Sequence, residues 1–149
     1  MFNMQAFFDA AKAGDIAGLR QFVNDNADLD AKDESGFTAL ILATREGHTD
    51  CVQLLLHANA NIETRDSYER TALVWAAANG DMPCTELLID ARADVEANDG
   101  ANDTALTCAA RNGHTACLQL LFDANADIHA KIVDGSTALI LAAANRRTA

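Results

Sequence analysis

Apolar and polar positions follow a pattern along this chain that returns every 33 residues. The segment TALILATREGH at 38–48 is followed by TALVWAAANGD at 71–81, TALTCAARNGH at 104–114 and TALILAAANRR at 137–147. Several apolar columns stay apolar in each copy, whereas the letters between them change. Repetition at a period of about 20 to 50 residues is typical of solenoids, in which each copy is one small structural unit.

The columns divide a single domain, residues 1–149, into successive units. Running the register backwards places Phe7, Gly14 and Leu19 in the same columns. The predicted units are 1–32, 33–65, 66–98, 99–131 and a truncated 132–149. No linker or low-complexity segment separates them, so we expect one continuous stack.

Each unit is predicted to contain two short helices. Thr38 suits an N-cap because its hydroxyl can accept an unpaired N–H of the first turn. Leu40, Ala43 and Thr44 then share one face of the first helix, which Gly47 ends. Helices this short cannot bury their own apolar faces, so each pair needs its neighbours.

The second helix is predicted at about residues 49–57. Asn59, near its end, suits the left-handed conformation, and Arg92 occupies that column in the next unit at a cost of roughly 1 kcal/mol. Pro83 falls in the first turn of its helix, where a missing N–H matters least.

The residues DESGFTALILATREGH, followed by CVQLLL and NANIE, resemble the ankyrin repeat. That family's pattern has an Asp and a Gly before a Thr-Pro-Leu-His helix, then Gly-His, a Leu-Leu helix and Gly-Ala-Asp. The resemblance covers essentially the whole chain. It implies an all-α ankyrin-repeat solenoid of stacked helix–turn–helix pairs with protruding β-turns, and it implies a curved stack.

The chain departs from the family's pattern at two columns and at its last unit. The family's Pro is replaced by Ala39, Ala72, Ala105 and Ala138, and its His by Ile41, Val74, Thr107 and Ile140. The hydrogen-bond network at the helix start must therefore differ here. The last unit has one helix, with Arg146 in the glycine column. It is either a minimal cap or continues in a longer protein, and its apolar TALILAAA favours continuation.

The formal net charge of −11 disfavours binding to nucleic acid or to an anionic membrane. It attracts a basic or mixed-charge protein partner, although it also serves simply to keep the chain soluble. No apolar run approaches the roughly 20 residues of a membrane span, and the N-terminus lacks the basic start of a secretory signal.

Cysteine, aspartate and histidine recur in columns, but none is predicted to form a reactive site. Cys51, Cys84 and Cys117 repeat at 33 residues, too far apart in a stack for disulfides or zinc, so we expect buried free thiols in a reducing compartment. That compartment is the cytoplasm, or alternatively the nucleus. Asp33 and Asp66 are interpreted as turn residues that accept local N–H groups. No catalytic set, cofactor site or metal site is predicted.

The changing letters of the first helix fall opposite Leu40, Ala43 and Thr44. In the ankyrin family this side lines a concave groove beside the turn tips. The resemblance thus implies an exposed apolar strip of Ile41/Leu42, Val74/Trp75, Thr107/Cys108 and Ile140/Leu141, although packing between first helices is the competing interpretation. The predicted partner-binding residues are Phe37, Ile41, Leu42, Arg45, Tyr68, Arg70, Val74, Trp75, Asp103, Thr107 and Arg111.

Three functional hypotheses follow. The first is a monomeric, non-enzymatic module that binds a partner protein through the concave face. The second is a structural or targeting segment of a larger protein that docks another domain through its C-terminal edge. The third is an enzyme, but the sequence predicts neither a closed pocket nor a nucleophile paired with a base.

Overall fold

The computed structural model describes residues 3–148, and the side chains of residues 3–146. Residues 1, 2 and 149, at the ends of the first and last predicted units, lie outside the described residues. Within this range the protein is all-α, with no strand and two isolated β-bridges, Asn98–Thr104 and Lys131–Thr137. The helices are α1 (Met4–Ala13), α2 (Ile16–Asn24), α3 (Ala39–Arg45), α4 (Thr49–His57), α5 (Ala72–Asn79), α6 (Met82–Asp90), α7 (Ala105–Asn112), α8 (Thr115–Asp123) and α9 (Ala138–Thr148).

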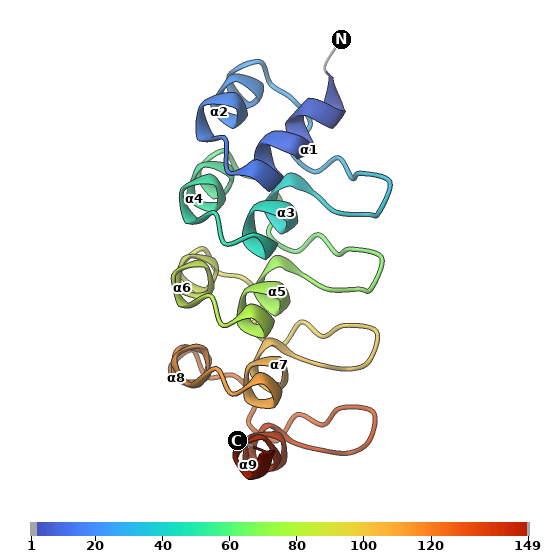
Figure 1. Ribbon diagram of the computed structural model, residues 1–149, viewed down its shortest axis with the longest axis vertical. Coiled ribbons are helices and arrows are strands. Elements are labelled where there is room, and N and C mark those ends of the chain that lie inside the picture. Colours follow the sequence, from blue (N-terminus) through green and yellow to red (C-terminus); the bar gives the residue numbers. More distant parts are fainter. Residues whose placement is uncertain (1–2, 149) are drawn as a thin grey trace.

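The helices form two parallel rows, as Figure 1 shows. The first helices α1, α3, α5, α7 and α9 make one row and the second helices α2, α4, α6 and α8 make the other. The connecting loops project from the row of first helices, away from the second helices (Figure 1). The expected stack of helical pairs is confirmed.

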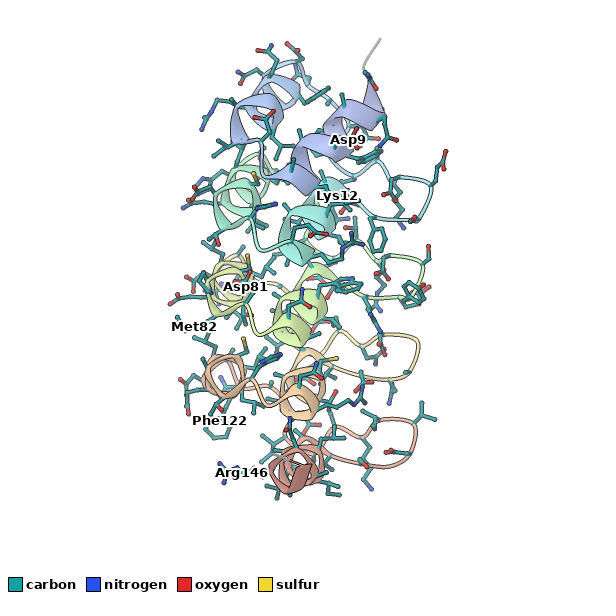
Figure 2. The ribbon with its side chains drawn as sticks, viewed as in Figure 1. Asp9, Lys12, Asp81, Met82, Phe122 and Arg146 are labelled. Carbon is teal, nitrogen blue, oxygen red and sulfur yellow. The ribbon has the colours of Figure 1, made fainter. Side chains whose placement is uncertain are left out.

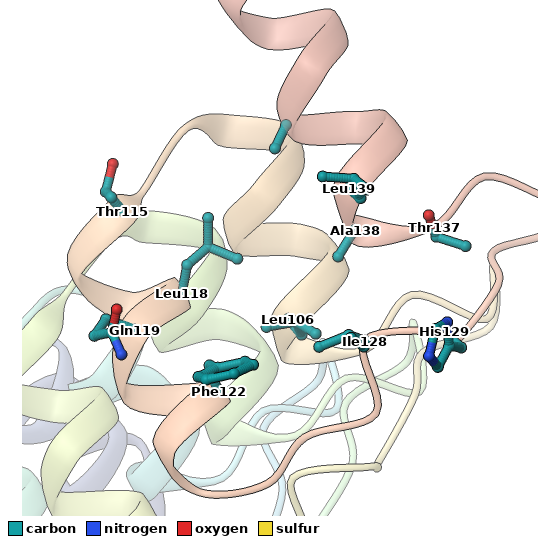
Figure 3. A pocket seen from close by; sticks show the side chains of 11 residues that line it. Leu106, Thr115, Leu118, Gln119, Phe122, Ile128, His129, Thr137, Ala138 and Leu139 are labelled. Carbon is teal, nitrogen blue, oxygen red and sulfur yellow. The ribbon is translucent and has the colours of Figure 1, made fainter.

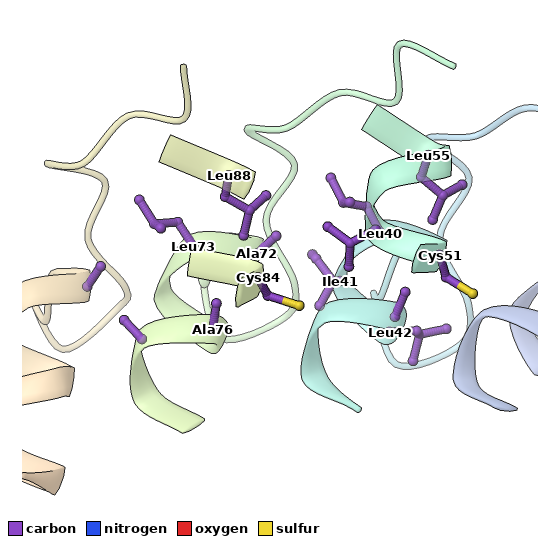
Figure 4. Packing of buried hydrophobic residues seen from close by; sticks show 14 of the residues in the cluster. Leu40, Ile41, Leu42, Cys51, Leu55, Ala72, Leu73, Ala76, Cys84 and Leu88 are labelled. Atoms are coloured by element: carbon purple, nitrogen blue, oxygen red, sulfur yellow. The ribbon is translucent and has the colours of Figure 1, made fainter. Parts of the chain in front are cut away.

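The buried core runs along the stack between the two rows. Leu40, Leu73 and Leu106, which share a column, are 1%, 1% and 3% exposed. They belong to one continuous cluster with Leu55 and Leu88 of the second helices (Figure 4). Because each pair leaves apolar surface for the next, the core grows with the stack.

The first helices begin and end where their residue types predict. The hydroxyls of Thr38, Thr71 and Thr104 each accept the N–H of the residue three positions on, at 3.3 or 3.4 Å. Gly80 and Gly113 adopt left-handed φ values of 72° and 75° as the chain leaves α5 and α7. A glycine adopts these values without the strain of a Cβ. The predicted N-caps and glycine stops are confirmed.

The hydrogen bonds at the helix starts differ between units, which the sequence analysis did not predict. Where Thr107 replaces the family's His, its hydroxyl accepts the N–H of Thr104 at 2.9 Å and donates to Asp103 Oδ1 at 3.0 Å. Ile41 and Val74 have no polar group with which to do the same. In those two units the side chain at this position therefore adds no hydrogen bond to the threonine cap.

The second helices also match the sequence. The helix predicted at about 49–57 is α4, and Pro83 lies in the first turn of α6. Asn59 and Arg92 both have positive φ, 65° and 69°, which confirms the left-handed column. Arg92 is thus held in a conformation that a non-glycine side chain normally avoids.

Asparagine side chains join three first helices, α5, α7 and α9, to the first helix before each of them. Nδ2 of Asn79 donates to the carbonyl of Arg45 at 3.0 Å, and Nδ2 of Asn112 donates to that of Ala78 at 2.9 Å. Asn145 donates in the same way to Arg111 at 2.8 Å. These bonds satisfy carbonyls at helix C-termini that would otherwise lack an intrahelical partner. The column was visible in the sequence, but its role was not predicted.

Candidate protein-binding surface

The predicted apolar strip is largely buried, and the expectation that it faces a groove is wrong for most of its members. Ile41, Val74 and Thr107 are 0%, 1% and 0% exposed, and Leu42 and Cys108 are also buried. Each inner first helix is packed against the first helices before and after it and against its own second helix. A helix with neighbours on three sides has no broad outer face. The sequence analysis assumed one buried side and one exposed side, and that assumption does not hold for these helices.

Five of the predicted residues nevertheless reach the surface on the loop side of the first helices. Tyr68 is 63% exposed, Arg45, Arg70 and Trp75 are partly exposed, and Arg111 is exposed. Phe37 and Asp103 are buried beneath this surface. We call Arg45, Tyr68, Arg70, Trp75 and Arg111, with the buried Phe37 and Asp103, the arginine–aromatic surface.

Stacked cations and rings form the centre of this surface. The guanidinium carbon of Arg45 lies 4.7 Å from the ring centroid of Phe37 and 5.9 Å from that of Trp75. That of Arg70 lies 4.9 Å from Trp75 and 5.5 Å from Tyr68. Phe37 meets Trp75 edge-on at 6.2 Å. Cation–π contacts at such sites contribute about 0.5–1 kcal/mol each and fix the side chains in place.

Buried carboxylates bind Arg70, Arg111 and the indole of Trp75, whereas Arg45 pairs with the exposed Glu46. Asp66 Oδ2 accepts the Nε1–H of Trp75 at 2.8 Å. Asp99 Oδ2 accepts from Nε of Arg70 at 3.4 Å, and both oxygens of Asp103 accept from Nη2 of Arg111 at 2.8 Å. The guanidinium groups of these arginines are thus already paired with carboxylates of the same chain.

Asp66 and the equivalent Asp33 of the preceding unit also order their turns. Oδ1 of Asp66 accepts the N–H groups of Tyr68 and Arg70 at 2.8 and 3.0 Å, and Asp33 accepts those of Ser35 and Phe37. The predicted turn role is confirmed. The sequence did not predict the second contact, from Asp66 to Trp75, because nine residues and a change of direction separate them.

The cysteines are buried and free, as predicted for a small apolar position. Cys51, Cys84 and Cys117 lie on the inner side of the second helices, and Cys108 lies on α7. Burial raises the pKa of the Cys84 thiol to about 12, and it does the same for Cys108. Protonated, enclosed thiols are poor nucleophiles and poor metal ligands. Among the described residues no cluster of His, Cys, Asp and Glu could hold a metal ion.

The histidines after the glycines serve the stack. Nε2 of His48 lies 3.0 Å from the carbonyl of Lys12, and Nε2 of His114 lies 3.0 Å from that of Ala78. A Cβ at Gly14 would meet the His48 ring at 2.7 Å, so the histidine and the glycine are matched across the unit boundary. These rings link one unit to the preceding one.

Comparison with protein families agrees with the repeat and the stacked helical pairs. A family model described as "Ankyrin repeats (3 copies)" matches residues 7–99 and 73–149, which together cover nearly the whole chain. The chain belongs to the ankyrin-repeat family. Ankyrin repeats are generally protein–protein interaction modules and are typically not enzymes.

The chain is also similar to a segment of the rat (Rattus norvegicus) protein "Glutaminase liver isoform, mitochondrial". The two are 43% identical over 47 residues, which is 32% of this chain and 8% of the glutaminase. Because the shared segment is so short, the similarity extends only to repeat sequence and says nothing about the rest of the glutaminase. In the part of this ankyrin-repeat chain that the structure describes, no helix has the length and apolar character to cross a bilayer.

Proposed function

We propose that this ankyrin-repeat protein is a non-enzymatic module that binds a partner protein through its concave face, at the arginine–aromatic surface. The observation that carries the proposal is the stacking of Arg45 and Arg70 on Trp75, Phe37 and Tyr68, with Trp75 held by the buried Asp66 and Arg70 by the buried Asp99. Tyr, Trp and Arg are the residue types enriched at binding hot spots. Because the cluster is ordered in the free protein, little side-chain entropy remains to be lost on binding.

The partner is proposed to be of mixed charge. The partly exposed guanidinium groups of Arg45 and Arg70, and the exposed one of Arg111, suit carboxylates or backbone carbonyls of the partner. The net charge of −11 over the whole chain draws basic segments towards it and repels nucleic acid. Four free thiols support a reducing compartment such as the cytoplasm or nucleus.

The buried members of the predicted strip are not part of this proposal. Ile41, Leu42, Val74 and Thr107 support the surface from within the stack. Phe37 acts in the same way, as the platform under Arg45.

The test uses two pairs of substitutions. Tyr68→Ala with Arg45→Ala removes one exposed ring and one stacked cation from the surface. Met82→Ala with Arg20→Ala removes an exposed apolar side chain and an arginine from the row of second helices, where Figure 2 places Met82. Proteins captured from a lysate with the wild-type chain are identified, and their Kd is then measured for each variant.

We expect the first pair to raise the Kd by roughly tenfold or more and the second pair to leave it nearly unchanged. Both pairs should melt within a few degrees of the wild type, since all four side chains reach the surface. Equal losses of affinity from the two pairs of substitutions, or an unchanged Kd for the first pair, would contradict the proposed site.

A further inference from the structure

Two neighbouring clefts on the row of second helices are copies of each other. One lies between α4 and α6 and has a volume of about 250 Å³, and the other lies between α6 and α8 and has a volume of about 200 Å³. Each has half-buried aliphatic side chains from both of its helices. The first is lined by Gln53, Leu56, His57, Leu87, Asp90 and Ala91, and the second, 33 positions on, by Glu86, Ile89, Asp90, Leu120, Asp123 and Ala124.

The charge of the lining differs between the copies. Between α4 and α6 one carboxylate lines the cleft, that of Asp90, whereas between α6 and α8 there are three, from Glu86, Asp90 and Asp123. Negative charge therefore increases along the row while the aliphatic positions are kept. The corresponding positions between α2 and α4 have no acid: Arg20, Val23, Asn24, Leu54, His57 and Ala58.

Two of the three acids are unfavourably placed for the helix that carries them. Glu86 and Asp90 lie four residues apart on α6, and like charges at this spacing destabilise a helix. Asp90 is also the last residue of α6, at the negative end of the helix dipole. On α8 the residue equivalent to Glu86 is Gln119, labelled in Figure 3, whose Nε2 donates to Asp123 at 2.8 Å. Helix stability therefore does not account for the two acids of α6.

No cation of the described chain is paired with these acids. Helices α4, α6 and α8 contain no Lys or Arg, and Arg92, two residues after Asp90, lines neither cleft. The carboxylates of Glu86 and Asp90 are exposed. The ion pairs of residues 3–146 all lie on the side of the first helices, and they are Arg45–Glu46, Arg70–Asp99 and Arg111–Asp103.

The cleft between α6 and α8 thus combines aliphatic walls with three carboxylates. Lysine and arginine side chains fit such a surface, because their aliphatic stems pack on apolar groups while the charged end stays at the rim. Packed helices lie about 8–10 Å apart, so the two clefts are separated by about that distance. In a polyproline II segment, residues three apart point the same way and are about 9 Å apart. Such a segment can therefore occupy both clefts.

We propose that the cleft between α6 and α8 binds one arginine or lysine side chain from an extended segment of a partner protein. The aliphatic stem packs on Ile89 and Leu120, and the cation lies among Glu86, Asp90 and Asp123. An apolar residue three positions away occupies the less acidic cleft between α4 and α6. This site is separate from the arginine–aromatic surface, so either proposal can fail without the other.

The probe is the peptide Gly-Leu-Pro-Pro-Arg-Pro-Pro-Leu-Gly with both ends blocked. Its prolines favour the polyproline II conformation, and a leucine three residues to either side of the arginine serves both chain directions. A matched peptide has citrulline, which has nearly the same shape without the charge, in place of arginine. The full chain, labelled with ¹⁵N, is titrated with each peptide up to about 5 mM, because exposed ion pairs contribute little to affinity.

The matched protein variants remove the same two charges from different places. One is Glu86→Gln with Asp90→Asn, and the other is Glu34→Gln with Asp50→Asn, which are exposed acids outside both clefts. We expect the arginine peptide to shift amide resonances of α6 and α8 in the wild type. The first variant should raise its Kd roughly fivefold or more, and the second by less than about twofold.

The citrulline peptide should bind the wild type roughly fivefold or more weakly than the arginine peptide does, and the two protein variants should bind it equally. The variant Glu86→Gln with Asp90→Asn should not have a lower melting temperature than the wild type, because it removes a like-charge pair from α6. That combination of weaker binding and undiminished stability separates a binding role from a structural one.

Four results would overturn the proposal. They are the absence of binding up to about 5 mM, amide shifts that avoid α6 and α8, equal Kd values for the two protein variants, and equal Kd values for the two peptides. A titration with free arginine completes the test. If free arginine binds as tightly as the peptide, the cleft takes a small cation and not a segment of a protein.

Discussion

The indole Nε1 of Trp75 donates a hydrogen bond of 2.8 Å to Oδ2 of Asp66. One residue lies on a first helix and the other at the start of the preceding turn, and Asp66 is 4% exposed. A single carboxylate therefore fixes both the turn that carries Tyr68 and Arg70 and the ring on which Arg70 stacks.

Removing this carboxylate should loosen the surface and the fold together. Asp66→Ala leaves two backbone N–H groups and the indole N–H without their acceptor, which we expect to lower the free energy of unfolding by about 2–3 kcal/mol. The emission of Trp75, the single tryptophan of the sequence, should shift to longer wavelength. Chemical denaturation and fluorescence spectra measure both effects.

The control for this substitution is Asp134→Ala. Asp134 is exposed and accepts the backbone N–H of Ser136 at 2.8 Å, with no aromatic partner. Its loss should change the free energy of unfolding by less than about 0.5 kcal/mol. Comparable losses of stability at the two aspartates would contradict the role given to Asp66 in the turn and beneath Trp75.

The two leucines that share a column should respond very differently to truncation. Leu106→Ala removes a buried side chain from the core and should reduce the free energy of unfolding by about 2–5 kcal/mol. Leu139→Ala removes an exposed one and should reduce it by less than about 0.5 kcal/mol. Urea titration of both variants tests this, and a large loss at Leu139 would contradict its exposed position.

The left-handed column allows a stabilising substitution. Arg92 has a φ of 69°, whereas asparagine occupies the same position in the neighbouring unit, at Asn59. Asparagine tolerates this conformation better, so Arg92→Asn should stabilise the fold by about 1 kcal/mol. The reverse change, Asn59→Arg, should destabilise it by a similar amount. Thermal melting of the two variants should therefore move in opposite directions, and shifts of the same sign would refute the argument.

The buried thiols should make stability fall in alkali. Burial raises the pKa of Cys84 and Cys108 from the usual 9.0 to about 12 in the folded state. Below pH 9 the thiols are protonated in both folded and unfolded chains, so their contribution is fully present. Between pH 9 and 12 the unfolded chain releases these protons and the folded chain keeps them, so stability decreases.

The thiol contribution is isolated by comparison with Cys84→Ala and Cys108→Ala. Between pH 8 and pH 10 the urea midpoint of the wild type should fall more steeply than that of either variant, because the variants lack one of the titrating groups. Parallel slopes in all three proteins would contradict the link between burial and alkaline instability.

Much of the fold could be predicted from the sequence because it depends on local or periodic chemistry. Thr38 caps its helix through a bond to a residue three positions on, and Asn59 has the backbone conformation that its side chain tolerates. Leu40 and Cys51 were predicted from their spacing to lie on the core-facing sides of their helices, and both are buried.

The candidate site was predicted less well, because exposure is not a property of one helix. Ile41 and Val74 were assigned to an outer face, yet adjacent first helices bury them. Arg45 and Trp75 do form part of one surface, but they lie 30 positions apart in the chain and meet through stacking between units. The asparagine column at Asn79 and Asn112 could have been recognised by its period of 33 residues.

By itself the sequence determined the repeat, the limits of the helices, their caps and the columns that face the core, since each of these follows from residue type and spacing. Only the tertiary structure decided which of the remaining side chains meet water or one another. Leu106 and Leu139 make the distinction plain: they have the same residue type and column, but within residues 3–148 only Leu106 has a second helix packed over it. Burial depends on what the rest of the chain brings alongside.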